Sequence, residues 1–388
     1  MDWSFLIKDK TSLCVTTDSR KVTPGCVFVA LKGEHFDGNA FVEQARRDGA
    51  EFVISGENAL AELQDLARAW RRELGLPIIG ITGTNGKTTT KELCAAVLST
   101  KYRLYYTQGN LNNQLGVPLT LLSMTREHEM GIVEMGASHP GDIKELVEIA
   151  EPNCGLVTNV GKAHLQGFGS FEGVQKTKAE LYDYLRAHGG FCFRNTDNPY
   201  LEKMAGDLRT VPYTTGTMPE GTHLVGGYNA ENVSAALCVG AYFGVSAKDA
   251  LAAIKAYVPT NNRSQLMKTE KNTLVVDAYN ANPTSMQAAI NAFTKSQSQR
   301  QCFILGAMRE LGEYSHLEHQ NVVNMLLERK AEKVLLVGDE YKETTAPYPI
   351  FDNVEMLCDY LKDHPIEGQQ VLLKGSRSNQ LEKVLPLL

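Results

Sequence analysis

The feature that most constrains the fold is the segment at residues 78–89, which reads IIGITGTNGKTT. A short apolar run leads straight into a glycine-containing loop, and Lys87 and Thr88 then open a stretch with helical character. This order predicts a buried strand, a tight loop whose backbone N–H groups face phosphate oxygens, and a helix whose N-terminal dipole attracts anions. Lys87 is expected to reach the β- and γ-phosphates, and the Thr88 hydroxyl to ligate Mg²⁺.

The spacing of the glycines departs from the general phosphate-loop pattern. That pattern requires glycine at position 81, where this chain has Ile81, and the loop glycine falls at Gly83 instead. An ordinary strand-to-helix turn with incidental glycine and lysine is therefore the alternative. The loop alone indicates a nucleoside triphosphate and leaves the chemistry open.

The rest of the chain alternates between strand-like and helical stretches, which predicts parallel sheets. With 388 residues the chain is too long for one ordinary core. The pattern breaks near Pro259, Asn261 and Asn262 and then restarts. We predict an α/β protein of three domains: a small mixed α/β N-terminal domain (1–75), a central P-loop-type domain with a mostly parallel sheet (76–258), and a C-terminal Rossmann-like domain (259–388).

Charge and composition exclude several classes of partner. The net charge is −6 without a Lys/Arg run, so a nucleic-acid partner is not expected. The start MDWSFLIKDK does not resemble a signal peptide, and no apolar run approaches the roughly 18 residues of a membrane span. The eight cysteines, Cys14 and Cys26 among them, form no CxxC pair, so we expect free thiols in a reducing compartment, the cytoplasm.

Several longer motifs resemble the Mur ligase family. The loop GTNGKTT and the segments at 109–118, 134–143 and 158–170 are similar to the central domain of that family. VDAYNANPTSM (276–286), LGAMRELGE (305–313) and LLKGSRS (372–378) resemble the C-terminal domain of the member that adds D-alanyl-D-alanine, and TDSRKVTPGCVFVALKGEHFDG (17–38) its nucleotide-sugar-binding domain. Ordered matches along almost the whole chain are far more specific than one motif.

The resemblance implies an ATP-dependent amide ligase. ATP would phosphorylate a carboxylate of UDP-N-acetylmuramoyl-tripeptide, and the amine of D-alanyl-D-alanine would displace phosphate from the acyl phosphate. ATP and Mg²⁺ are the expected cofactors, and we expect a monomer. The alternatives are a sibling that adds one amino acid, a polyglutamate synthase, or a catalytically silent nucleotide-binding relative. Two departures bear on the last alternative: the stretch between Asn198 and Gly226 is short, and Ala307 replaces the usual aspartate.

Three residues are expected to hold a second metal ion by resemblance. Glu134 follows a strand, at the carboxyl edge where open α/β sheets bind ligands; otherwise it is a solvated strand-end carboxylate. His164 follows the next strand and is otherwise a structural histidine. Lys178 lies in a helical stretch and matches a family lysine that reacts with CO₂ to form a carbamate, whereas Lys176 should point elsewhere. Lys87, Glu134, His164 and Lys178 are the predicted catalytic residues, and Thr88, Glu134, His164 and Lys178 the predicted metal ligands.

The other predicted contacts also follow from the resemblance. The nucleotide would be held by the loop and by residues similar to the family's adenine, phosphate and ribose contacts: Gly83, Thr84, Asn85, Gly86, Lys87, Thr88, Thr89, Asn229, Asn232, Arg263 and Asp277. Asn229 could instead be a helix N-cap. The predicted substrate contacts are Ser19, Arg20, Asn110, Asn280 and Asn282. For Asn280 and Asn282 a turn role before Pro283 is equally open, and for Arg20 a solvated surface.

Overall fold

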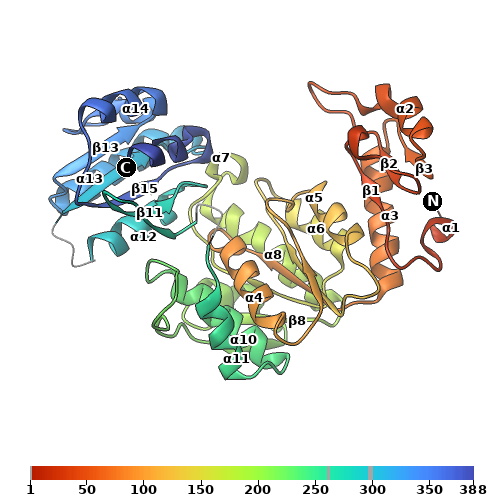
Figure 1. Cartoon of the computed structure of the whole chain (residues 1–388). Helices are drawn as coiled ribbons and strands as arrows, with labels where there is room; N and C mark the ends of the chain where they lie inside the picture. The colour runs from red at the N-terminus through yellow and green to blue at the C-terminus, as the bar shows by residue number, and fades with distance from the viewer. Residues whose placement is uncertain (1, 260–262, 296–299) are drawn as a thin grey trace.

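Three sheets, which follow one another along the chain, form three units in a row (Figure 1). The computed structural model describes residues 2–259, 263–295 and 300–388. The break predicted at Asn261 and Asn262 therefore lies outside the described residues. The central unit lies between the N-terminal unit and the C-terminal unit (Figure 1), and the α/β architecture with three units is confirmed.

The central sheet has six strands, all parallel, in the order β5-β6-β4-β7-β8-β9. Its strands are β4 (Ile78–Thr82), β5 (Leu104–Tyr106), β6 (Met130–Glu134), β7 (Cys154–Val157), β8 (Phe191–Asn195) and β9 (Thr210–Tyr213). Strands β4, β6 and β7 are buried along their whole length, as expected where helices cover both faces. The short 198–226 stretch leaves β9 as the edge strand.

Helices cover both faces of this sheet. One face packs against α4 (Lys87–Leu98), α10 (Asn229–Tyr242) and α11 (Ala247–Ala256). The other packs against α5 (Gly116–Leu122), α6 (Asp142–Ala150) and α8 (Phe171–Ala187). Two shorter helices, α7 (Leu165–Phe168) and α9 (Pro199–Ala205), complete the unit.

The C-terminal unit is a second doubly wound sheet, in the order β10-β11-β15-β12-β13-β14. Its strands are β10 (Gln265–Lys268), β11 (Thr273–Asp277), β12 (Gln301–Gly306), β13 (Lys333–Val337), β14 (Ile350–Phe351) and β15 (Gln370–Lys374). Among the described strand pairs of this sheet, only β10 and β11 are antiparallel. Helices α12 (Pro283–Thr294) and α13 (Ser315–Glu328) share one apolar core with the sheet, and α14 (Val354–Asp363) shares the other.

The N-terminal unit is small. It has a three-stranded parallel sheet of β1 (Val15–Thr16), β2 (Val27–Val29) and β3 (Phe52–Ile54), with α1 (Ser4–Ile7) and α2 (Val42–Arg47). The long helix α3 (Ala59–Leu74) joins it to the central unit, where Trp70 Nε1 donates to Met124 O at 2.9 Å. Helix α3 thus shares its core with both units.

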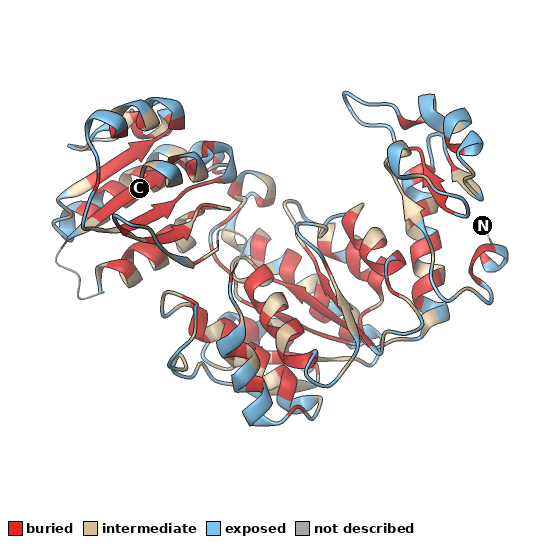
Figure 2. Ribbon diagram, in the orientation of Figure 1, coloured by how far each residue is buried: buried red, intermediate tan, exposed pale blue. Residues whose placement is uncertain are grey.

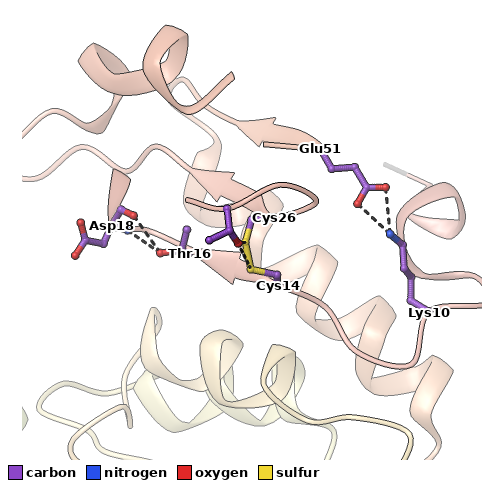
Figure 3. Close-up of a disulfide and its surroundings, with 7 residues drawn as sticks. Lys10, Cys14, Thr16, Asp18, Cys26 and Glu51 are labelled. Carbon is purple, nitrogen blue, oxygen red and sulfur yellow. Dashed lines mark hydrogen bonds and ion pairs between the residues drawn. A yellow bond between two sulfur atoms is a disulfide. The ribbon is translucent and has the colours of Figure 1, made fainter. Parts of the chain in front are cut away.

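The prediction that every cysteine is a free thiol is wrong for two of them. Cys14 and Cys26 form a disulfide (Figure 3). They precede β1 and β2, two neighbouring parallel strands, so the strand pairing brings their sulfurs together. No sequence motif marks this pair, because the contact arises from the sheet. In the same view Lys10 pairs with Glu51 at 3.0 Å, next to β3 (Figure 3). The other six cysteines are free, as predicted.

Buried residues are concentrated on the strands and on the inner faces of the helices (Figure 2). Among the described residues, none of the helices is both long enough and apolar enough to cross a bilayer.

Candidate active site

A cavity of about 850 Å³ lies where the central and C-terminal units meet. The loops after β4, β6 and β7 line one side, which is the carboxyl edge of the parallel sheet. The loop between β11 and α12 lines the opposite side. The predicted position at the carboxyl ends of the strands therefore coincides with this cavity, in line with the general rule for open α/β sheets.

The phosphate-loop glycines are required by neighbouring segments of the chain. Gly83 has φ +141°, and a Cβ there would lie 2.0 Å from Thr158 Oγ1. Gly86 has φ +77°, and a Cβ there would lie 2.3 Å from Asn232 Oδ1. Ile81, at the position where the general pattern has glycine, is fully buried in β4. Glycine is therefore required at 83, where the loop turns closely against Thr158 of the β7 loop.

Lys87 is the first residue of α4, as predicted. Its Nζ donates to Gly83 O at 2.8 Å and to Thr84 O at 3.0 Å, so the ammonium lies inside the loop. Burial lowers the pKa of Lys87 to about 8. A phosphate in this loop would supply the missing opposite charge.

Thr88 and Glu134 lie together at the start of α4, as their predicted shared metal role requires. Thr88 Oγ1 donates to Glu134 Oε1 at 3.1 Å, and Asn112 Nδ2 donates to the same oxygen at 2.8 Å. Glu134 Oε2 is buried and accepts no hydrogen bond within the described chain, although the ammonium of Lys91 lies 3.7 Å away. A buried carboxylate oxygen without a donor beside a threonine hydroxyl fits a hard cation such as Mg²⁺. Lys91, which is fully buried on α4, was not among the predicted site residues.

His164 lies at the same edge but has a partner in the C-terminal unit. It adopts φ +50°, and its Nδ1 pairs with the carboxylate of Glu310. Among the described residues, no three His, Cys, Asp or Glu side chains form a group that could hold a metal ion. The second predicted metal site is therefore not assembled from side chains of these four types.

Lys178 is 2% exposed on α8, while Lys176 is exposed, as the helical spacing predicted. Its Nζ lies 5.3 Å from the ring centre of Phe168, and burial lowers the pKa of Lys178 well below its usual value. An ammonium does not ligate Mg²⁺, so the amine does not fit this role. Its carbamate, which carries a carboxylate-like group, does.

The two predicted adenine residues begin α10. Asn229 is the first helical residue and Tyr228 is the N-cap, so Asn229 is not an N-cap. Asn229 Nδ2 donates to Val225 O at 2.7 Å, and Asn232 Nδ2 donates to Asn229 Oδ1 at 2.9 Å. Thr90 Oγ1 donates to Asn232 Oδ1 at 3.0 Å, which ties α10 to the phosphate-loop helix.

Arg263 and Asp277 face the cavity from the C-terminal unit. The Arg263 guanidinium lies 3.8 Å from the ring centre of Tyr279, and its buried Nε has no hydrogen-bond partner within the described residues. Asp277 Oδ2 pairs with Lys374 Nζ at 2.7 Å. Lys374 is 1% exposed and was not predicted, although it lies in the LLKGSRS motif.

The predicted substrate residues lie in two places, the cavity and the N-terminal unit. Asn110, Asn280 and Asn282 line the cavity. Asn282 is also the N-cap of α12, with a reciprocal capping box, so the turn role is confirmed for it. Ser19 and Arg20 lie in the N-terminal unit and are not part of this cavity lining. Arg20 pairs there with Asp18 at 2.9 Å.

Ala307 is fully buried at the end of β12. Its carbonyl accepts from Asn379 Nδ2 at 2.8 Å, and a Cβ on Gly338 would lie 2.6 Å from its own Cβ. The nearby carboxylate of Glu340 pairs with Arg309. A carboxylate therefore remains in this region, in the short 3-10 helix Asp339–Tyr341 that follows β13.

Known proteins of one family match this chain along almost its whole length. Residues 13–95 match the model "Mur ligase family, catalytic domain", residues 81–221 "Mur ligase middle domain", and residues 262–377 "Mur ligase, glutamate ligase domain". The UDP-N-acetylmuramoyl-tripeptide–D-alanyl-D-alanine ligase of Bacillus subtilis is 34% identical, over 96% of this chain and 92% of its own length. The enzyme of that name from Escherichia coli is 33% identical, over 98% and 94%. The structure of the MurF ligase of Thermotoga maritima in complex with ADP is similar with a TM-score of 0.86 and 28% identity, covering 98% of each chain.

Proposed function

The chain belongs to the Mur ligase family, and from this membership we propose how its residues carry out the family's reaction. It is an ATP-dependent ligase that forms a peptide bond: it adds D-alanyl-D-alanine to UDP-N-acetylmuramoyl-tripeptide in peptidoglycan synthesis. The observation that carries the assignment of roles is the cavity itself, which is lined by the phosphate loop, by Glu134 with Thr88 bonded to it, and by Arg263.

In the first step a carboxylate oxygen of the tripeptide attacks the γ-phosphorus of ATP and ADP leaves. Backbone N–H groups of the loop and Lys87 would hold the phosphates, and Arg263 would neutralise charge from the opposite side. Asn229 and Asn232 would contact adenine, and Asp277 the ribose. Loss of Lys87 should therefore abolish turnover.

Mg²⁺ would be held by Thr88 and Glu134, and a second ion by Glu134, His164 and Lys178 in its carbamate form. The ions would screen the negative charge that gathers on the phosphate oxygens. The burial of Lys178 supports the carbamate, because the neutral amine is the form that reacts with CO₂.

In the second step the amine of D-alanyl-D-alanine attacks the carbonyl carbon of the acyl phosphate. Phosphate leaves, and the amine loses a proton as the amide forms. Asn110 and Asn280 line the cavity and would contact the acceptor and the dipeptide, and the contact between the two units would exclude water from the acyl phosphate. Ser19 and Arg20 would bind the uridine nucleotide in the N-terminal unit, so the long substrate would extend from there to the cavity.

We also propose domain boundaries at 1–75, 76–258 and 259–388, a monomer, and a cytoplasmic location, where ATP and the nucleotide precursor are available. No nucleic-acid partner is part of this proposal.

Isotope transfer tests the acyl-phosphate route. The terminal carboxylate of the tripeptide is labelled with ¹⁸O, and the released phosphate is analysed by mass spectrometry after turnover with ATP and D-alanyl-D-alanine. One labelled oxygen per amide bond is expected in the phosphate, because that oxygen bridges carbon and phosphorus in the intermediate. Unlabelled phosphate would overturn the route.

A further inference from the structure

The side chain of Asn85, at the tip of the phosphate loop, contacts the C-terminal unit. Asn282 Nδ2 donates to Asn85 Oδ1 at 2.8 Å, and Asn85 Nδ2 lies 3.5 Å from Asn282 Oδ1. The two residues are 197 positions apart in sequence. The contact therefore exists only when the C-terminal unit is docked on the central unit.

The backbone of Asn85 is already fixed by its own unit. Its N–H donates to Asn159 Oδ1 at 3.0 Å, and its carbonyl accepts from Thr158 Oγ1 at 2.6 Å. The loop is thus shaped by the β7 loop, and the amide of Asn85 is the group left to face the other unit.

The side chain of Asn282 makes two separate hydrogen bonds. Its Oδ1 accepts from Ser285 N at 2.9 Å and so caps α12, while its Nδ2 reaches the phosphate loop. Asn282 is 5% exposed, so its end of this part-buried hydrogen bond is shielded from water. A buried amide that loses its partner is left without a hydrogen bond, which makes the contact energetically significant.

The same end of α12 contacts the next loop of the central unit. Lys162 N donates to Thr284 Oγ1 at 3.0 Å, and a Cβ on Gly161 would lie 2.8 Å from that oxygen. At its other end, the β11–α12 loop is held by Lys374, which contacts Asp277 at 2.7 Å and Asn280 O at 3.2 Å. A shift of α12 would therefore also displace Tyr279 and Asn280 of the β11–α12 loop and Asp277 at the end of β11, which line the cavity.

We propose that Asn282 is a positioning residue that joins α12 to the phosphate loop through Asn85, so that nucleotide binding and docking of the C-terminal unit stabilise each other. Coupling of this kind is reciprocal: whatever docking adds to nucleotide affinity, the nucleotide adds to docking. The inference rests on the proposed nucleotide site and assigns Asn282 to the contact between the units, not to the dipeptide.

The chain offers a variant that separates capping from coupling. Asn282→Ser keeps a good N-cap residue, because serine caps helices as well as asparagine, but its shorter side chain does not reach Asn85. Asn353→Ser is the matched control, since Asn353 caps α14 by accepting from Met356 N at 3.0 Å and is exposed. Asn85→Ala removes the other half of the pair.

The experiment measures ADP binding to the full chain by calorimetry, and the change in radius of gyration on ADP addition by X-ray scattering. Asn282→Ser should raise the ADP dissociation constant about three- to tenfold, as expected for one lost hydrogen bond, and reduce the compaction. Asn353→Ser should match the wild type in both. The Asn85→Ala/Asn282→Ser double variant should bind no more weakly than the weaker single variant, because both remove one interaction.

The proposal would be overturned if Asn282→Ser bound ADP as tightly as the wild type and became as compact on binding. Fully additive losses of ADP affinity in the double variant would overturn it too. Failure of the wild-type chain to bind ADP would instead count against the nucleotide site itself, so the two failures are distinguishable.

Discussion

At the scale of single residues, the site depends on charged groups held away from water. Glu134, Lys178 and Lys374 are each at most 2% exposed, and Glu134 and Lys374 line the cavity. A buried charge requires a partner, and here the partners are other side chains or are expected to be ligands. Where the expected partner is a bound ligand, replacement of the buried group should therefore lower the catalytic rate more than the stability of the fold.

Lys178→Ala should lower kcat by about two orders of magnitude or more, because a metal ligand stabilises transition-state charge by several kcal/mol. A short carboxylate such as formate should restore part of the rate by occupying the space of the carbamate. Steady-state kinetics with and without formate measures this, with Lys176→Ala on the exposed side of α8 as the control. Full activity of Lys178→Ala would remove the carbamate from the mechanism.

His319 should make the stability of the C-terminal unit depend on pH. Its Nε2 accepts from Met308 N at 3.0 Å and its Nδ1 faces Ser315 O at 2.7 Å, so the neutral ring fits, and burial lowers its pKa from 6.5. As the pH falls, His319 is therefore protonated in the unfolded chain before it is protonated in the folded chain. This part of the stability is present above pH 6.5 and is lost as the pH falls toward the folded pKa.

Denaturant titrations between pH 8 and 5 measure this effect. His319 contributes at most about 1.4 kcal/mol per pH unit to the slope of the free energy of unfolding against pH, which is the value for one proton. His319→Gln should flatten the profile below pH 6.5, and His316→Gln, at an exposed position nearby, should not. Identical slopes in wild type and His319→Gln would show that another group is responsible.

At the scale of elements, the strand–loop–helix unit of β4 and α4 makes the site possible, and its glycines test this directly. Gly86→Ala should abolish measurable ADP binding, because its Cβ would collide with Asn232 in addition to the strain of φ +77°. Gly141→Ala is the control: φ is +90° there, but a Cβ would meet nothing within 4 Å. Both variants should lose about 1–2 kcal/mol of stability from the backbone strain. Equal ADP affinity in the two variants would contradict the role of the Asn232 contact.

Much of this element structure follows from local pattern. The run IIGIT, the helical spacing that buries Lys178 and exposes Lys176, and the alternation of strands and helices were all readable in the sequence. What was not readable depends on contacts between distant segments. The Cys14–Cys26 pair needs β1 beside β2, and the Asn85–Asn282 and His164–Glu310 contacts need the docked C-terminal unit. No local periodicity encodes such contacts, so motif resemblance predicted His164 and Asn282 as site residues but not the partners that they contact.

At the scale of the whole molecule, the cavity is shared between two units, and neither unit completes it alone. Lys162 of the central unit pairs with Glu318 of the C-terminal unit at 3.0 Å, beside the contacts made by Asn282 and Thr284. An ion pair with an exposed partner, such as Lys162, contributes little to stability, about 1 kcal/mol or less. Docking is therefore the sum of several modest contacts, which suits a site that must open to admit substrates and close for chemistry.

The most direct test of the central claim is phosphate release from Mg-ATP with UDP-N-acetylmuramoyl-tripeptide, measured with and without D-alanyl-D-alanine and followed by mass analysis of the product. We predict sustained release only with both substrates, and a product heavier than the tripeptide precursor by one dipeptide residue mass. ATP binding without substrate-dependent release, or a product of unchanged mass, would contradict the assignment of this chain as the ligase.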